Sequence, residues 1–297
     1  MTDADAWNDF WAANADGGRG GCLPQRWAAI EEAQRAEWRE FIADLPENAR
    51  MLDLATGDGR VLGWMQRERS DLGLTGIDLA PELPNPPAGT TILGGIAMEA
   101  LPFADREFSA VVSQFGFEYG EVTKVAAEIG RVIAPGGKIG LMVHRGDGPI
   151  LEHNQARRDA IDWVLGEQKL GTTMMAALES PQGGPQVAAQ VAAAIGLLGA
   201  RKFGDDSPGW EIPEAMRRAV LMGAPAGLPA IMATIQEIES RARNELGRIA
   251  SLARACATAD ERDAIAEAFA AQGFALHSSD DVREPSGRAL ASFLVFS

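Results

Sequence analysis

Residues 50–65, RMLDLATGDGRVLGWM, contain closely spaced acids and glycines between an apolar run and a helical pattern. The apolar run ends at Asp53, and Gly57 and Gly59 flank a second acid, Asp58. Glycines in such a turn let the backbone approach a ligand closely, and the helix that follows offers free N–H groups. The chemistry that this pattern predicts is the binding of a nucleotide-like ligand.

Two kinds of ligand fit this turn. The glycine spacing over 57–63 is one residue longer than the usual dinucleotide fingerprint, and Asp78 ends the next apolar run, where an acid would hold ribose hydroxyls. S-adenosylmethionine also has a ribose, but it is net cationic and has no phosphate. Unit charges about 4 Å apart interact by about 4 kcal/mol at an effective dielectric near 20, so Asp53 and Asp58 favour the cationic ligand. The alternative that Asp58 merely caps the helix stays open.

The elements that must position these residues alternate between strand and helix. Apolar, strand-like runs lie at 50–55, 72–80, 90–95, 107–117 and 138–144. Helical patterns lie between them at 59–69 and 121–134, and the second is predicted to stop at a turn over 135–137. This alternation predicts a parallel sheet covered by helices on both faces. A further helix at 259–274 and an antiparallel hairpin around 285–287 are expected at the end.

Two other segments are predicted to be helical. Residues 1–48 contain four of the tryptophans: Trp7, Trp11, Trp27 and Trp38. Residues 148–258 show no strand signal, and helices are expected there at 151–169, 186–199, 213–222 and 229–256. We therefore expect an N-terminal helical cap at 1–48, a sheet domain made of 49–147 and 259–297, and a helical insertion at 148–258 that serves as a substrate lid.

Composition limits the partners. The formal net charge of −15 disfavours binding to nucleic acid or to an anionic membrane surface. No apolar run reaches the roughly 20 residues of a membrane span, and the start MTDADAWNDF lacks the features of a signal peptide. Cys22 and Cys256 are expected to be free thiols, and no Cys/His cluster has ligand spacing, so no metal is predicted. We expect a cytoplasmic protein, and the sequence leaves a homodimer open.

Four motifs occur in the order and spacing of the class I S-adenosylmethionine-dependent methyltransferases. They are LDLATGDG, GIDLA, MEALPFADREFSAVVSQFGFEY and EIGRVIAPGGKIGLMV. Over 50–144, and more loosely over 274–297, the chain resembles the branch that methylates small molecules. The resemblance implies an α/β, Rossmann-like, seven-stranded sheet that is mostly parallel, with an antiparallel last strand beside the fifth. It also implies in-line methyl transfer from S-adenosylmethionine to a small molecule, with S-adenosylhomocysteine as product.

The resemblance also implies roles for individual residues. Asp78 would take the ribose hydroxyls, Leu79 would lie against the adenine, and Gln114 and Phe115 would close over the cofactor near the methyl group. Ala97 and Met98 would lie at the adenine edge; the acid that often binds the adenine amino group is absent there, and Glu99 is one substitute. The methionine end of the cofactor would be lined by Asp53, Ala55, Thr56, Gly57, Asp58 and Gly59, with Ala55 in place of the first glycine of the family's loop.

The acceptor site of the family implies a second set of residues, over the ends of strands four and five. Glu118 and Tyr119 follow the fourth strand, and His144 and Arg145 follow the fifth. His144 is the candidate general base because the ordinary pKa of histidine is about 6.5. The alternative is that His144 ends a strand and bonds to a neighbour for structural reasons. Tyr119 and Glu118 are candidates for contact with the acceptor.

Three other functions stay open. An NAD(P)-dependent oxidoreductase would use a similar turn, but the extra acid and the EALPF…PGG sequence argue against it. A non-catalytic protein that binds S-adenosylmethionine would share the turn and Asp78. An RNA or protein methyltransferase is disfavoured because the segment 113–116 reads SQFG instead of an Asn/Asp-Pro-Pro-Tyr signature.

Overall fold

The structure is a computed structural model that describes residues 28–297. Residues 1–27 of the predicted cap at 1–48, with Trp7, Trp11, Trp27 and Cys22, lie outside the described residues. The rest divides into two compact units, which we call the sheet unit (28–151 and 251–297) and the helical unit (152–250). The division falls inside two helices, α5 (Pro149–Asp162) and α9 (Leu228–Asp260).

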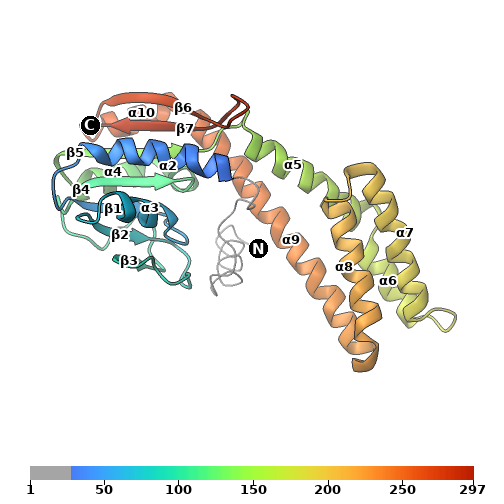
Figure 1. Ribbon diagram of the computed structural model, residues 1–297. Helices are drawn as coiled ribbons and strands as arrows, with labels where there is room; N and C mark the ends of the chain where they lie inside the picture. Colours follow the sequence, from blue (N-terminus) through green and yellow to red (C-terminus); the bar gives the residue numbers. More distant parts are fainter. Residues whose placement is uncertain (1–27) are drawn as a thin grey trace. The chain divides into compact units, whose positions relative to one another are not determined.

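The sheet unit contains one sheet built from seven described strands, in the order β3-β2-β1-β4-β5-β7-β6 (Figure 1). The first five strands pair in parallel, and β7 pairs antiparallel with both β5 and β6. The predicted Rossmann-like sheet with its antiparallel last strand is therefore confirmed. The strands are β1 (Arg50–Leu54), β2 (Gly73–Ile77), β3 (Thr90–Leu93), β4 (Phe108–Gln114), β5 (Ile133–Val143), β6 (Leu276–Arg283) and β7 (Ala289–Phe296).

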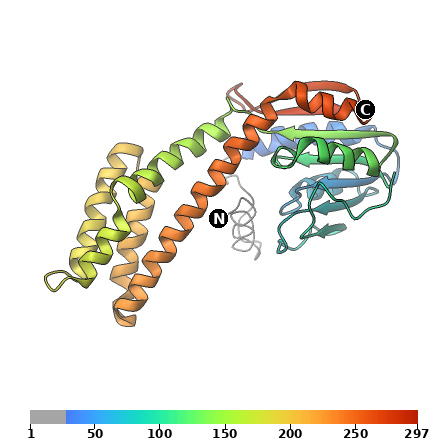
Figure 2. The ribbon, with the colours of Figure 1, turned by 180° about the vertical axis from the view of Figure 1, so that it is seen from behind.

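Helices cover both faces of this sheet, as the continuous apolar strands require. On one face, α2 (Ala28–Ala43) and α3 (Arg60–Glu68) pack together and bury side chains such as Trp38 and Met65. On the other face, α4 (Val122–Val132) lies beside α10 (Arg262–Ala270), which Figure 2 shows in front of the sheet. The carboxyl ends of β1, β2, β4 and β5 are thus held at one rigid edge, where an open α/β sheet binds its ligands.

Strand β5 begins earlier than expected. The sequence predicted a turn at 135–137 and a strand from 138, but β5 starts at Ile133 and passes through these residues. Its pairing with β4 jumps from Phe108↔Ile133 to Ala110↔Lys138, which is a bulge. Pro135 needs no ladder bond in a bulge, and Gly136 has a positive φ of 78° there. The Pro-Gly-Gly segment therefore kinks the strand instead of preceding it.

The helical unit holds α6 (Leu170–Glu179), α7 (Pro185–Phe203) and α8 (Pro208–Gly223), with a π-helical turn, η3 (Trp163–Glu167), after α5 and a 3₁₀ turn, η4 (Ala224–Ala226), after α8. Helix α6 was not predicted from the sequence, and its weak helix formers include Gly171, where a Cβ would collide with the Glu239 carboxylate of α9. The predicted helix at 213–222 was too short, because α8 begins at Pro208 and contains Pro213. Pro213 has no N–H, so the Gly209 carbonyl receives no helical hydrogen bond. This carbonyl lies against Gly199 of α7.

None of the described helices is long and apolar enough to cross a membrane. In the same part of the chain, no group of three or more His, Cys, Asp or Glu side chains is placed to hold a metal ion. Cys256 is a free, buried thiol, and burial, aided by the charge of Glu118, raises its pKa to about 12.

Candidate active site

The turn after β1 has an unusual backbone. Ala55, Gly57 and Gly59 all have positive φ angles, of 54°, 55° and 70°. A Cβ at Gly59 would lie 2.6 Å from the Ile92 side chain and 2.8 Å from that of Pro87, so glycine is required there by both conformation and space. The turn is tied to β2 by a hydrogen bond from Thr56 N–H to the Ile77 carbonyl (2.9 Å). It therefore presents a fixed arc of backbone at the sheet edge.

Asp53, near the end of β1, is a buried carboxylate with one oxygen unused. The Thr56 hydroxyl donates to its Oδ2 (2.6 Å), whereas Oδ1 has no hydrogen-bond partner among the described residues. Desolvation, together with the negative charges of Asp78 and Asp58, raises the pKa of Asp53 to about 7. A buried, unpaired carboxylate oxygen is costly, and a cationic donor from outside the chain would satisfy it.

Asp78 follows β2 and joins the turn to the next segment. Its Oδ2 accepts a hydrogen bond from Gly57 N–H and its Oδ1 accepts one from Ala80 N–H, both at 2.9 Å. Burial raises its pKa, although these backbone donors oppose the effect. Each carboxylate oxygen keeps a second acceptor site, because a carboxylate has about four lone-pair positions. Asp78 can therefore hold the turn and accept a ligand hydroxyl pair at once.

Asp58 differs from Asp53 because it has a cationic partner within the turn. The Arg60 guanidinium donates to both of its oxygens, the shortest contact being Nη2 to Oδ2 at 2.9 Å. Arg60 N–H also donates to Asp58 Oδ1 (3.1 Å), whereas the N-cap residue of α3 is Gly59 and makes no side-chain cap. Of the two acids in the motif, Asp53 is thus the one whose charge has no ion pair among the described residues.

The segment after β3 lies beside Asp78. Ile96 N–H donates to the Asp78 carbonyl (2.9 Å) and Gly95 N–H to the Ala80 carbonyl (3.1 Å). Ala97 and Met98 follow directly and are half-buried, whereas Leu79 is 54% exposed. The side chain of Glu99 accepts a hydrogen bond from Glu121 N–H (3.0 Å). Backbone hydrogen bonds therefore tie the segment after β3 to the residues around Asp78.

At the end of β4, Gln114 is fixed by α2. Trp38 Nε1–H donates to Gln114 Oε1 (2.6 Å), and Gln114 Nε2 donates to Gln34 Oε1 (3.3 Å). Phe115 follows with a positive φ of 57°, and its N–H donates to the Met142 carbonyl of β5 (2.8 Å). The carboxyl end of β4 is therefore held from both sides.

Glu118 and His144 are brought together at the ends of β4 and β5. Glu118 lies in the 3₁₀ turn η2 (Phe117–Tyr119), and its Oε1 accepts from both the backbone N–H of His144 (2.9 Å) and the imidazole Nδ1 (2.8 Å). Both side chains are buried, with exposed fractions of 8% for His144 and 0% for Glu118. The Phe115 ring stacks on the imidazole at 4.3 Å between centroids, and Tyr119 meets it edge-on at 6.1 Å.

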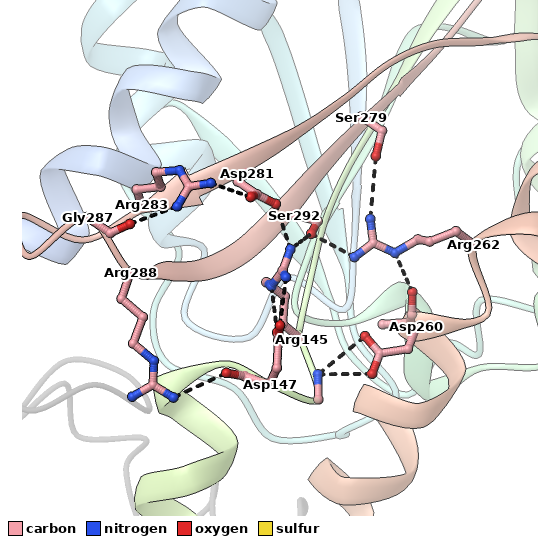
Figure 3. A network of polar contacts seen from close by, with 12 residues as sticks. Arg145, Asp147, Asp260, Arg262, Ser279, Asp281, Arg283, Gly287, Arg288 and Ser292 are labelled. Atoms are coloured by element: carbon pink, nitrogen blue, oxygen red, sulfur yellow. Dashed lines mark hydrogen bonds and ion pairs between the residues drawn. The ribbon is translucent and has the colours of Figure 1, made fainter.

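A polar network fixes the loop that follows His144 (Figure 3). Arg145 donates to Asp281 (2.6 Å) and to Asp147 (2.8 Å), and Gly146 N–H donates to both carboxylate oxygens of Asp260 (3.2 and 3.3 Å). Figure 3 shows Arg145 and Arg262 converging on the buried hydroxyl of Ser292. Arg145 therefore anchors the loop to the β6–β7 hairpin and is occupied there.

The structure gathers the sequence-predicted residues into two neighbouring groups within the sheet unit. The cofactor candidates after β1, β2 and β3 form the first group, and Phe115, Glu118, Tyr119 and His144 form the second. Sequence reasoning named Glu118 and His144 separately and missed their pairing, because strand ends do not reveal side-chain direction. It also missed Arg60, although an Asp-x-Arg spacing at a helix start could have signalled the ion pair, and it gave no role to Gln34 or Ser292.

Part of the chain is similar in sequence to known proteins. Residues 52–141 match the family described as "Methyltransferase domain". The demethylmenaquinone methyltransferase of Thermus thermophilus is 34% identical over 113 residues, which are 34% of this chain and 51% of that protein. The enzyme of the same name from Deinococcus radiodurans is 33% identical over 118 residues, which are 37% and 48% of the two chains. This chain thus spans about half the length of these curated relatives.

Solved structures include a Burkholderia thailandensis 1,6-didemethyltoxoflavin-N1-methyltransferase with bound 1,6-didemethyltoxoflavin and S-adenosylhomocysteine. It is 11% identical, with a TM-score of 0.44, over 99% of this chain and 87% of that one. The segment that matches the methyltransferase-domain family, residues 52–141, contains the turn after β1, the parallel strands β2, β3 and β4, and most of β1 and β5. The regions on either side of this segment, including the helical unit, lie outside the match.

Proposed function

We propose that this protein is an S-adenosylmethionine-dependent methyltransferase that acts on a small molecule. The observation that carries the proposal is the buried, unpaired Oδ1 of Asp53 in a glycine turn tied to Asp78. A pyrophosphate beside this carboxylate would add like charge to a desolvated site, whereas the ammonium group and sulfonium of S-adenosylmethionine carry the charge that it lacks. The match to the methyltransferase family supports the same choice.

The residues present fit this cofactor from end to end. Asp53 and the backbone of 55–59 would hold its methionine end, and Asp78 would accept hydrogen bonds from the ribose hydroxyls. Leu79, with Ala97 and Met98, offers the apolar surface on which an adenine ring would lie. When bound, the cofactor supplies an electrophilic methyl group on a sulfonium sulfur.

The chain's own contribution to the transfer is alignment and exclusion of water. Gln114 and Phe115 are immobilised by α2 and β5 at the border between the two residue groups. Phe115, Tyr119 and His144 present ring surfaces beside that border. We propose that they receive a planar, ring-bearing acceptor, and the relatives named demethylmenaquinone methyltransferases support an acceptor of this kind. The helical unit is proposed to serve as the substrate lid.

Calorimetric titration of one sample with S-adenosylmethionine, S-adenosylhomocysteine and NADH tests the proposal. We expect the two adenosyl ligands to bind and NADH not to bind; binding of NADH alone would overturn it. Asp53→Asn keeps the shape of the side chain but removes its charge, so affinity for S-adenosylmethionine should fall about 10- to 100-fold, as expected when a charge-assisted hydrogen bond is lost. Asp58→Asn is the matched control, with an expected change below about threefold because Asp58 already has Arg60.

Asp78→Ala tests the ribose contact. The loss of a charge-assisted hydrogen-bond pair should weaken cofactor binding by about 1–3 kcal/mol. An unchanged dissociation constant would mean that Asp78 is not the ribose acid. A protein that binds S-adenosylmethionine but never forms S-adenosylhomocysteine with any acceptor would be a non-catalytic binder, and turnover assayed by mass spectrometry separates that function from the enzyme.

A further inference from the structure

The Glu118–His144 contact defines which imidazole nitrogen carries the proton. Glu118 Oε1 already accepts the backbone N–H of His144, and the Nδ1 atom lies 2.8 Å from the same oxygen. A carboxylate oxygen is an acceptor, so the hydrogen-bond network assigns the proton to Nδ1. In the neutral ring the lone pair is then on Nε2, the nitrogen that can take up a proton.

Two polar atoms of the pair lack a hydrogen-bond partner among the described residues, Nε2 of His144 and Oε2 of Glu118, and Oε2 is buried. The imidazole is stacked by Phe115. Tyr119, on the same turn as Glu118, approaches the imidazole, and the thiol of Cys256 on α9 feels the Glu118 charge. Burial and ring stacking fix the direction of the imidazole, which is what a general base requires.

From this geometry we infer that His144 is the general base of the transfer, that Glu118 is its positioning residue, and that the methyl acceptor is a ring-bearing hydroxyl that is protonated when it binds. The inference rests on the proposed methyl transfer and adds to it the class of acceptor. An acceptor that is already ionised when it binds, such as a carboxylate, needs no base. It would also be repelled by the negative charge of Glu118, which contacts the His144 imidazole. A neutral hydroxyl needs a base and brings no charge.

The step balances within the proposed reaction. The acceptor O–H bond breaks and its proton goes to Nε2 of His144, while the electron pair stays on the oxygen and forms the new O–C bond to the methyl group. The C–S bond breaks and its electron pair remains on sulfur, which loses its positive charge. The imidazolium that results is stabilised by the Glu118 carboxylate at Nδ1.

The first test is the tautomer of His144, read by nitrogen NMR of the full-length protein labelled with ¹⁵N-histidine and saturated with S-adenosylhomocysteine at pH 8. The His144→Gln variant assigns the signal among the three histidines. We expect Nδ1 protonated and Nε2 bare in the wild type. Glu118→Gln keeps an acceptor oxygen and should keep this tautomer, whereas Glu118→Ala should shift the population towards the Nε2–H form. A wild-type signal with the proton on Nε2 would overturn the inference.

The second test is proton donation to Nε2, with 2-naphthol as the probe and 2-methoxynaphthalene as its control without the hydroxyl proton. We expect 2-naphthol to shift the Nε2 resonance and the methoxy compound to leave it in place. Equal shifts, or no shift with 2-naphthol, would overturn the assignment of His144 as base. The affinity of His144→Gln for S-adenosylmethionine should stay within about twofold of the wild-type affinity. If the wild-type protein does not bind S-adenosylmethionine, that result contradicts the proposed function instead.

Discussion

The backbone of Gly116 lies against the methyl group of Ala55. A Cβ at position 116 would overlap the Cβ of Ala55 and would lie 3.0 Å from Ser113 Oγ. Ala55 belongs to the turn after β1 and Gly116 to the loop after β4, and these strands are neighbours in the sheet. The cofactor turn and the loop that leads to Glu118 are therefore packed as one body, with glycine required at the contact.

Gly116→Ala should disturb both groups of site residues together. The added methyl forces the turn and the loop apart, which is an overpacking effect that typically costs about 1–3 kcal/mol of stability. We expect a lower midpoint in urea unfolding and at least tenfold weaker binding of S-adenosylmethionine. Gly166→Ala is the control, since a Cβ there would meet open space. Equal behaviour of the two variants would show that the close contact has no role.

Ala55→Gly should stabilise the protein. Ala55 has a φ of 54°, a left-handed conformation that costs a non-glycine residue about 1–2 kcal/mol. Glycine removes this strain but gives the unfolded chain more freedom, so a net gain of about 0.5–1 kcal/mol is expected in urea unfolding. The change also removes the Cβ that Gly116 faces, so the double variant Ala55→Gly/Gly116→Ala should recover part of the loss from Gly116→Ala. A destabilised Ala55→Gly protein would contradict this account.

Asp53 should make the stability fall as the pH rises. Its pKa is about 7 in the folded protein and about 3.9 in an unfolded chain, so between pH 4 and 7 the folded state holds a proton that the unfolded state has released. Stability from this group is therefore greatest below pH 4, decreases through that window by up to about 4 kcal/mol, and is level above it. Asp53→Asn removes the titration, so urea unfolding should favour the variant more at pH 8 than at pH 5.

The comparison at two pH values isolates this group, because other titrations are shared by both proteins. A stability difference between Asp53→Asn and wild type that is the same at pH 5 and pH 8 would contradict the raised pKa. Saturating S-adenosylmethionine should reduce the difference at pH 8, since a bound cation stabilises the ionised carboxylate.

Asp260→Ala should loosen the loop after His144. The carboxylate accepts the N–H of Gly146, and its removal leaves that donor without its protein acceptor. A loss of about 1–2 kcal/mol in stability is expected, together with faster hydrogen exchange of residues 144–148. Asp159→Ala is the control, because its exposed carboxylate pairs with neighbouring Arg158 at the surface and should change stability by less than about 0.5 kcal/mol.

Much of the sheet could be predicted from the sequence because each strand is a continuous apolar run bounded by turn residues. The hairpin at the end was predicted in the same way, and the resemblance gave its place beside the fifth strand. The bulge in β5 could not be predicted, since Pro135-Gly136-Gly137 has the composition of a turn and only pairing with β4 decides otherwise. Helix α6 was missed because Gly171 weakens the local signal and packing against Glu239 is a tertiary effect.

For the site, the sequence could name candidate residues but not their partners. The acids of the turn were evident, yet the pairing of Asp58 with Arg60 and the unused oxygen of Asp53 depend on side-chain directions. In the same way, Glu118 and His144 are 26 residues apart, and their contact depends on the 3₁₀ turn after β4. The roles of the cofactor and acceptor residues stay predictions that the binding and NMR experiments address.

The position of β7 has a consequence for how the chain reaches this structure. β5 pairs with β7 along Ile139–Val143, yet residues 144–288, with the whole helical unit, lie between the two strands in sequence. While the chain emerges from the ribosome, β5 therefore exposes an unsatisfied, apolar edge for the time needed to make those residues. Such an edge can template mispairing with another chain, so crowding of nascent copies is the stage at which this protein is most exposed to aggregation.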